Sequence, residues 1–476
     1  MAMAENQIRV FKSLKETRKP EVAKIIGEIP EWAAGQVSRS CPAKWDYPKF
    51  RLNHTFDGYQ MITKFDIKGG KSGSVSFTSK FVSSEAFKRA EASQKPIISE
   101  FSTRTAGSDA KSALGKIVAM ILQATDNCQY ICTSEICRNP IVIGHAGFMY
   151  ELDPKSLHCI SKYDSANDFS LHAISAHPLT DPATGETYNV GISIVPAVKW
   201  KVVKYPQGCK SSPLKETLKK GKIIGSHSCR TKSGVPLLHS FGMSNNYLVW
   251  IDQPCHFNLA KAIKLMFKGF CQREVMDWFP EKKNQFYIFN KKTLKVMKTE
   301  ILSKDAFVFL HILNCYEEND HLIVDLFGMP NIQFVDAQVL AKLRAWHVLR
   351  DAECPRLLRF VIPLGVATIG ICPENKNLVS VNSTATALKI DDKIFLQPEL
   401  VSDVKMDFPT WNKKFSGKDL RFVWTTGALC PSVHHHKVIK LKTIWFGKLF
   451  GNEGEMAGFY GMAGWEGFER GRKGLF

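Results

Sequence analysis

Three histidines recur in similar settings along the chain and could together hold a metal ion. His177 stands in SAHPLTDPATGETYNVG, His239 in HSFGMSNNYLVW and His311 in HILNCYEENDHLIVDL. Each precedes a turn-rich stretch that leads into an apolar strand, and the intervals between them are 62 and 72 residues. Imidazole nitrogens suit Fe(II), zinc or copper. A metal centre is one interpretation, and three separate histidines that hydrogen-bond in a core or a turn are the other.

The intervals match the length of chain that four short strands and their loops consume. Histidines at equivalent positions of successive four-stranded units would converge on the axis of a β-propeller. Strand-like segments rich in Val, Ile, Phe and Tyr, many of them bounded by turn residues, lie at 71–82, 186–195, 245–254, 284–297 and 321–328. Strand–turn–strand units at 147–160 and 286–297 favour a propeller or a sandwich over a parallel α/β sheet.

Two segments have the periodicity of amphipathic helices, 112–123 and 258–270, and the second carries regularly placed lysines. The apolar face of the first consists of Leu114, Ile117, Val118, Ile121 and Leu122. These residues are candidates for docking on a membrane surface, with lysines facing anionic headgroups. The alternative is that each helix packs on the protein's own core. A further helix-like segment, 336–349, is expected as a loop insertion on one face.

The composition narrows the class of protein. The 476 residues carry a net charge of +19, which suits an acidic partner such as an anionic membrane surface. The basic residues are dispersed and form no nucleic-acid-binding signature, so no nucleic acid partner is expected, and no obligate protein partner is evident. The 13 cysteines have no pairing pattern and the N-terminus does not resemble a signal peptide, which indicates a reducing compartment. No hydrolase, dehydrogenase, zincin or nucleotide-binding motif occurs.

At these histidines the sequence resembles the carotenoid oxygenases, which include animal carotenoid cleavage dioxygenases and a retinoid isomerohydrolase. The likeness runs from about residue 29 to about residue 441. The three histidine motifs resemble the family's iron-ligand motifs, and further segments match in the same order. These are IPEWAAG (29–35), FDGYQMITKF (56–65), KNLVSVNSTATALKIDDKIFLQPEL (376–400) and MDFPTWNKKFSGKDLRFVW (406–424).

The resemblance implies an all-β fold, a seven-bladed β-propeller with a few helices in loops on one face. It implies Fe(II) on the propeller axis, held by four histidines, of which His177, His239 and His311 match. Glutamates of the family orient the ligand imidazoles, as the partners of metal ligands generally do. One of these glutamates falls at Asp407, a shorter carboxylate, and another near Glu135, one residue out of step.

The likeness ends near residue 445, before the family's fourth histidine. We therefore expect an N-terminal extension over 1–28, the propeller over 29–445 with an incomplete last blade, and a tail over 446–476 outside the fold. That tail contains nine glycines in the 30 residues from Gly447. A splice product, a flawed gene model, or a diverged member that fills the fourth position with water would each explain the departure.

By this resemblance the chain is a dioxygenase that uses Fe(II) and O2 to cleave a double bond of a carotenoid or apocarotenoid, giving aldehydes or ketones. A retinyl-ester isomerohydrolase and a non-catalytic carotenoid- or retinoid-binding propeller are the alternatives. The expected location is the cytoplasm, in peripheral association with a membrane, and a mitochondrial location stays open.

Overall fold

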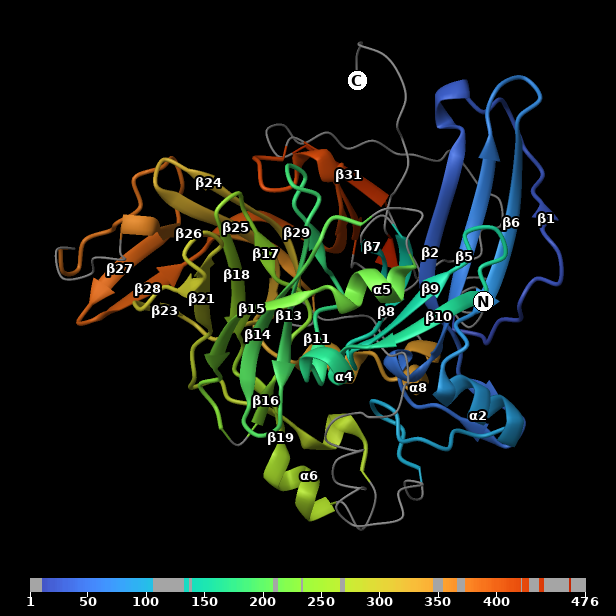
Figure 1. Cartoon of the computed structure of the whole chain (residues 1–476), viewed down its shortest axis with the longest axis horizontal. Coiled ribbons are helices and arrows are strands. Elements are labelled where there is room, and N and C mark those ends of the chain that lie inside the picture. The colour runs from blue at the N-terminus through green and yellow to red at the C-terminus, as the bar shows by residue number, and fades with distance from the viewer. Residues whose placement is uncertain are drawn as a thin grey trace.

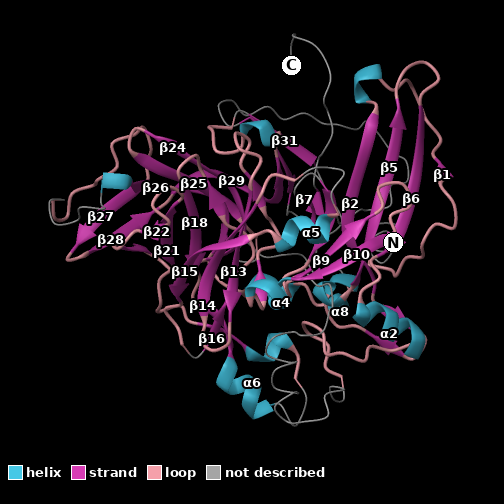
Figure 2. Ribbon diagram, viewed as in Figure 1, coloured by secondary structure: helices cyan, strands magenta, loops and turns pink. Residues whose placement is uncertain are grey.

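The computed structural model describes residues 11–105, 132–136, 139–208, 213–232, 234–265, 270–345, 354–365, 373–420, 422–427, 436–440 and 462–463. Within these ranges the protein is mainly β, with a few short helices (Figures 1 and 2). This confirms the strand-rich class that the sequence indicates. The seven-bladed arrangement stays a prediction.

The strands form several sheets, most of them built from strands that are close in the chain, with β27 (Thr386–Ile390), β28 (Lys393–Gln397) and β32 (Met462–Ala463) as exceptions. The first has the order β1 (Glu21–Val22), β6 (Ser74–Phe81), β5 (Tyr59–Lys68), β2 (Gly35–Lys44) and β32 (Met462–Ala463). The second has the order β10 (Cys159–Asp164), β9 (Phe148–Leu152), β8 (Asn139–Ile143) and β7 (Cys132–Ile136). The third contains β11 (Ala173–Ile174), β13 (Thr187–Ser193), β14 (Lys199–Tyr205) and β15 (Lys222–Ser228), with β12 (Leu179–Thr180) also on β13.

The remaining sheets carry the second half of the chain. A small sheet contains β16 (Gly234–Pro236), β19 (Cys255–Asn258) and β20 (Met276–Trp278). The next contains β17 (Gly242–Met243), β18 (Tyr247–Asp252), β21 (Gln285–Asn290), β23 (Glu300–Ser303), β28 (Lys393–Gln397) and β27 (Thr386–Ile390), with β22 (Lys295–Val296) on β21. The last contains β24 (Val308–Glu318), β25 (His321–Met329), β26 (Arg356–Pro363), β29 (Glu399–Thr410), β30 (Phe422–Gly427) and β31 (His436–Lys440), and a separate hairpin pairs β3 (Asp46–Tyr47) with β4 (Phe50–Arg51).

Apolar side chains between neighbouring sheets form the core. Val190 and Trp200 of the third sheet share a buried cluster with Trp250 and Tyr287 of the β17–β28 sheet. The Trp250 and Tyr287 rings stack with centroids 5.5 Å apart. Equivalent clusters join the first sheet to the second, the second to the third, and the β17–β28 sheet to the last. Each sheet is therefore buried against its neighbours, as in a layered all-β protein.

The strand predictions are confirmed at β6, β13, β18, β21 and β25, and the unit at 147–160 forms the hairpin β9–β10. In the segment predicted as a helix over 258–270, α6 spans Leu259–Leu265, and residues 266–269 lie outside the described residues. Asn258 ends β19, where it lies opposite Gly234, and its Oδ1 accepts a hydrogen bond from the Lys261 N–H. The same residue thus ends the strand and caps the helix.

The helix-like segment at 336–349 is represented by two short helices, α7 (Gln333–Ala337) and α8 (Leu340–Arg344). They are separate because Val339 is extended and forms a β-bridge with His54. The other helices are α2 (Glu85–Ser93), α4 (Ser165–Phe169) and α5 (Leu214–Lys219), with 3-10 turns at Glu31–Ala33, Thr55–Asp57, Gln272–Val275 and Lys413–Phe415. In Figure 1, α2, α4, α6 and α8 gather along the lower side of the view. Among the described helices, none has the length and apolarity needed to cross a membrane.

The two ends of the chain meet the first sheet. Phe11 is buried in a cluster with Trp45 and Tyr47, and β1 pairs with β6. Two tail residues, Met462–Ala463, pair with β2 at Ser40 and Arg39. The domain boundaries at 28 and 445 stay predictions.

Candidate metal centre

Three imidazoles from three different sheets meet at one point. His177 lies between β11 and β12, His239 between β16 and β17, and His311 within β24. The Nε2 atom of His239 lies 3.0 Å from Nε2 of His177 and 3.1 Å from Nε2 of His311. One nitrogen from each ring falls within 4.8 Å of the others. Among the described residues, this is the only group of its kind that could hold a metal ion.

β-Bulges direct two of the central side chains. The pairing of β24 with β25 shifts register between Phe309 and Ile312, around His311. The pairing of β29 with β30 shifts between Asp407 and Thr410, and Phe408 adopts a φ of 54° there. A bulge turns a side chain away from the regular alternation of a strand. Both irregularities therefore set the direction in which a residue of the centre points.

Two serine hydroxyls join the backbones of successive histidine segments. Ser175 Oγ accepts from the His177 N–H and donates to the His239 carbonyl oxygen, at 3.1 and 2.8 Å. Ser240 Oγ accepts from the Ile312 N–H and donates to the Leu310 carbonyl, at 2.8 and 2.6 Å, on the two sides of His311. Each hydroxyl satisfies a backbone donor and a backbone acceptor, so the spacing between neighbouring histidines is fixed by hydrogen bonds as well as by packing.

A carboxylate supports His311. The Nδ1 of His311 lies 2.7 Å from Asp407 Oδ1, and both side chains are buried. An ionised carboxylate can only accept, so His311 donates from Nδ1 and its Nε2 carries a lone pair toward the other two rings. The Phe408 N–H also donates to Asp407 Oδ1, at 2.7 Å, which fixes the carboxylate.

A fourth imidazole, that of His145, supports His239. His145 lies in the turn between β8 and β9, and its Nε2 lies 2.7 Å from His239 Nδ1. The ring centroids lie 4.7 Å apart and the ring planes differ by 25°, so the rings meet edge to edge through this contact. The His145 carbonyl oxygen also accepts from the Ile174 N–H, at 2.9 Å, three residues before His177. His145 thus contacts two of the three histidine segments.

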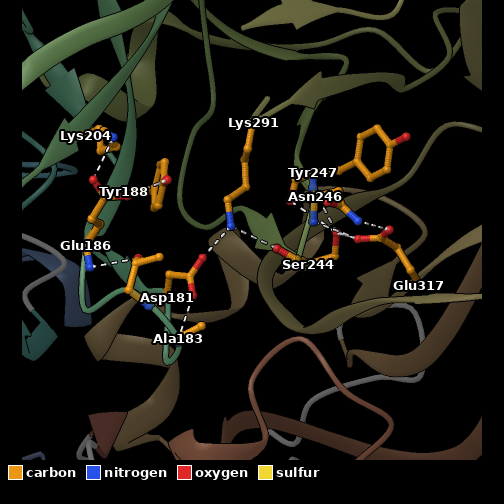
Figure 3. Close-up of polar contacts among 11 residues, drawn as sticks. Asp181, Ala183, Glu186, Tyr188, Lys204, Ser244, Asn246, Tyr247, Lys291 and Glu317 are labelled. Carbon is orange, nitrogen blue, oxygen red and sulfur yellow. Dashed lines mark hydrogen bonds and ion pairs between the residues drawn. The ribbon is translucent and has the colours of Figure 1, made fainter. Parts of the chain in front are cut away.

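A polar network farther along the same segments ties their turns together (Figure 3). Asp181 follows His177, Ser244 follows His239 and Glu317 follows His311. Lys291 Nζ lies 2.7 Å from Asp181 Oδ2 and 3.3 Å from the Ser244 carbonyl oxygen. Ser244 Oγ donates to Glu317 Oε1, at 2.5 Å. One continuous set of polar contacts therefore links all three segments that bear the histidines.

Burial favours the neutral form of His177 and His239. It lowers the pKa of His177 and His239 well below the ordinary value, and neighbouring histidines lower it further. Burial also lowers the pKa of His145 to about 4. His145 is partly exposed and lines a cavity. Neutral imidazole is the form that binds a metal.

The donor set fits a divalent transition metal. Nitrogen separations near 3 Å are what two imidazole ligands adopt when they lie about 2.1 Å from one ion at roughly a right angle. The lone pair that Asp407 leaves on His311 points into the same space. Iron, zinc, copper and nickel all accept an imidazole set.

An apolar cavity reaches this centre. Its polar lining residues are His145, His172, His239, Asn258 and Gln272. Its wall is otherwise mostly apolar and contains five phenylalanines, namely Phe56, Phe101, Phe257, Phe270 and Phe334. Leu259 and Ala262 of α6 complete the lining on one side. An apolar cavity with few polar groups is typical of a site for an apolar small molecule.

The sequence-predicted residues fall into two groups. The structure brings His177, His239, His311 and Asp407 together. Glu135 lies on β7 opposite Pro140, but its side chain is outside the described residues, and so is the segment with Leu114, Ile117, Val118, Ile121 and Leu122. Their roles stay predictions.

Sequence reasoning missed His145. It stands in GHAGF, a glycine-rich turn, and differs in setting from the three histidines that precede strands. The usable signal was its position, two residues before the strand–turn–strand unit that begins at Gly147. His172, which also lines the cavity, accepts from the Ile194 N–H at Nδ1, at 3.0 Å.

The fold and site define a mainly β protein with a three-histidine centre beside an apolar cavity. A family model described as RPE65, retinal pigment epithelial membrane protein, matches residues 10–445. The chain therefore belongs to the RPE65/carotenoid oxygenase family, as its motifs predict.

Two relatives that are named as carotenoid dioxygenases are 28% identical to the chain over the aligned residues. A carotenoid-cleaving dioxygenase, mitochondrial, from Pongo abelii is 28% identical over 450 residues, covering 87% of this chain and 76% of the relative. The beta,beta-carotene 15,15'-dioxygenase of Homo sapiens is 28% identical over 432 residues, with the same coverage of 87% and 76%.

Solved structures share the fold. An ACO/RPE65 chimera aligns with a TM-score of 0.69 at 18% identity, covering 94% of this chain and 84% of the chimera. Cobalt-substituted Synechocystis ACO aligns with a TM-score of 0.67 at 17% identity, with the same coverage of 94% and 84%.

Proposed function

We propose that the chain binds Fe(II) through His177, His239 and His311 and, with O2, cleaves a double bond of a carotenoid or apocarotenoid into aldehyde or ketone products. The observation that carries the proposal is the meeting of three imidazoles, one of which, His239, also lines a largely apolar cavity. Family membership supports the same reaction, because relatives are named carotenoid dioxygenases.

The protein's own residues would set up the metal and the substrate. When bound, iron would supply the O2 chemistry that no side chain provides. Three neutral ligands leave coordination positions open, and Asp407 is the one carboxylate that contacts them in the described structure. The Asp407 carboxylate holds His311 in the tautomer whose Nε2 can bind metal. Ser175 and Ser240 hold the spacing between the rings.

The cavity wall would select a long apolar substrate. Aromatic side chains such as Phe56 and Phe101 offer flat surfaces for a conjugated chain, and their ring centroids lie 5.4 Å apart. The apolar wall excludes water from a reactive carbon chain and orients it by shape. Which double bond would lie beside the centre depends on that shape.

Two other activities use the same features. A retinyl-ester isomerohydrolase would use the metal as a Lewis acid and would need no O2. A non-catalytic carrier would hold a carotenoid or retinoid without turnover. Activity on β-carotene that depends on O2 favours the dioxygenase, whereas anaerobic turnover of a retinyl ester favours the isomerohydrolase.

We further propose peripheral membrane association in the cytoplasm, with the mitochondrion as the alternative because one set of relatives carries that word in its name. Helix α6 lines the cavity and exposes Ile263 and Lys261, so an apolar substrate could enter there from a bilayer. Asp substitutions at Leu114 and Ile117, and separately at Ile263, should release the protein from anionic liposomes. Unchanged liposome binding in both variants would exclude membrane association.

The first experiment is metal analysis of the chain purified without oxygen, beside a His177→Ala/His239→Ala double variant. We expect near-stoichiometric iron in the parent chain and its loss in the double variant. The parent chain is then assayed on β-carotene with and without O2. Folded protein that binds no iron would exclude the dioxygenase reaction for this chain.

A further inference from the structure

His145 is placed to control a metal ligand without binding the metal itself. Its Nε2 lies 2.7 Å from His239 Nδ1, whereas His239 Nε2 faces His177 and His311. The two nitrogens of His239 therefore face two different groups. The contact with His145 is on the side of the ring away from the other histidines.

The protons on this pair follow from what each nitrogen must do. A metal on His239 Nε2 needs the lone pair there, so the proton of a neutral His239 is on Nδ1. His239 Nδ1–H then donates to His145 Nε2. His145 in turn keeps its own proton on Nδ1, and it also has a hydrogen bond with the backbone of Leu238. The result is a directed chain from metal ligand to imidazole to backbone.

A second contact fixes His145 itself. Its carbonyl oxygen accepts from Ile174, and Gly144 donates to Phe148 at 3.2 Å to close the turn that carries it. In that turn Gly147 has a φ of 82°, and a Cβ there would lie 2.6 Å from Ser165 Oγ. The turn can thus hold the imidazole in one place.

We propose that His145 is a positioning residue of the metal centre, a neutral acceptor that fixes the tautomer and plane of His239 and leaves the bound metal with one negative charge fewer than a carboxylate there would give. The inference rests on the proposed function, because it requires that the histidines hold a metal. Carboxylate partners raise the basicity of a ligand imidazole, and a neutral partner does so less. His145 would therefore leave the metal more electron-poor on this side.

The test uses Co(II) binding, followed by visible absorption, in the full chain and in three variants of His145. His145→Phe keeps an aromatic ring but cannot accept, so Co(II) affinity should fall by about 10–100-fold. His145→Gln offers a neutral oxygen at about the same reach and should restore most of that loss. His145→Glu offers a charged oxygen and should bind Co(II) at least as tightly as the parent chain.

Charge has its own readout, the midpoint potential of bound iron. His145→Glu should shift that potential to more negative values relative to the parent chain, and His145→Gln should leave it near the parent value. His172→Phe is the matched control, because His172 lines the same cavity and should leave Co(II) affinity unchanged.

The outcomes separate the two proposals. If the parent chain binds Co(II) no better than His177→Ala/His239→Ala, the proposed metal function fails. If the parent binds but His145→Phe binds equally well, or if Gln and Glu fail to restore what Phe loses in folded protein, the positioning role is overturned. An unshifted potential in His145→Glu overturns the charge effect. Near-ultraviolet circular dichroism establishes folding, and the shift in midpoint potential of His145→Glu carries the test if His145→Phe does not fold.

Discussion

The two sides of the metal centre are supported by different chemistry. His311 donates to the Asp407 carboxylate at 2.7 Å, whereas His239 contacts the imidazole of His145 at the same distance. Both arrangements orient a ring and fix its tautomer. Of these two partners, Asp407 and His145, only Asp407 adds a negative charge. The two partners therefore lie at the same distance from their histidines but differ in charge.

The difference has a structural origin. Asp407 lies at a bulge of β29, where Phe408 has a φ of 54° and donates to the same carboxylate oxygen. His145 lies in a turn whose contacts reach Ile174 and the Leu238 backbone. One support belongs to the last sheet and the other to the second sheet. Substitutions can therefore alter each side separately.

The largest expected effect on Co(II) affinity follows from making the partner of His311 neutral, like the partner of His239. Asp407→Asn replaces the carboxylate by a neutral acceptor, and we expect Co(II) affinity to fall toward the upper end of the range of about 10–100-fold. The midpoint potential of bound iron should rise in the same variant. Both quantities come from Co(II) titration and redox titration of the full chain. An affinity within twofold of the parent would mean that charge at Asp407 has no effect on the centre.

A smaller effect is expected farther from the metal, at the network of Figure 3. In the native protein, Lys291 helps to hold the pKa of the Asp181 carboxyl below its usual value. Lys291→Met removes this cation and leaves Asp181 without it. The pair is mostly buried, so we expect a loss of about 2 kcal/mol in the free energy of unfolding, between the values for exposed and buried pairs.

Urea unfolding measures that loss, and Lys292→Met is the matched control because Lys292 is exposed in the same turn. Co(II) affinity should change less than tenfold in Lys291→Met. A larger change in affinity than Asp407→Asn produces would show that the outer network, and not the inner partners, determines the position of the histidines.

The sequence predicts the Asp407 side of the centre better than the His145 side. His177, His239 and His311 precede recognisable strands, and Asp407 follows from a motif. His145 does not, because its importance depends on a contact with a residue 94 positions away that no local pattern records. Its turn, GHAGF, has the composition of an ordinary loop.

The same limit applies to the elements. Runs such as 321–328 predict strands because they are rich in apolar and β-branched residues, which pack well on the buried face of a sheet. For the helix predicted from residue 258, periodicity cannot show that Asn258 pairs in β19 before it caps α6. Bulges at His311 and Asp407 also depend on partner strands, so their effect on side-chain direction was not predictable.

The hydrogen bonds of the Ser175 and Ser240 hydroxyls allow the two pairs of neighbouring histidine segments to be compared. Ser240→Ala removes the bridge on the His311 side and Ser175→Ala the bridge between His177 and His239. Each leaves a buried backbone donor and acceptor unpaired, so each should lower the free energy of unfolding by about 1–2 kcal/mol. Thermal or urea unfolding of the metal-free chain measures this. Parent-like stability in both variants would show that packing alone sets the spacing.

His54 provides a buried imidazole away from the centre, with a backbone carbonyl as its support. Its Nε2 lies 2.7 Å from the Val335 oxygen and its Nδ1 accepts from the Phe56 N–H. Burial lowers the pKa of His54 to about 4 from an ordinary 6.5. Between about pH 6.5 and pH 4, His54 is therefore protonated in the unfolded chain but neutral in the folded chain. The contribution of neutral His54 to the free energy of unfolding is present above pH 6.5 and is lost as the pH falls toward 4.

His54→Gln keeps a donor for Val335 but does not titrate. Between about pH 7 and about pH 5.5 the parent chain should lose about 1 kcal/mol more free energy of unfolding than this variant. Urea unfolding of both metal-free proteins at the two pH values measures the difference. Because the other buried histidines are present in both proteins, their titration cancels. Equal losses would mean that His54 binds protons alike in the folded and unfolded chains, which contradicts the lowered pKa that burial causes.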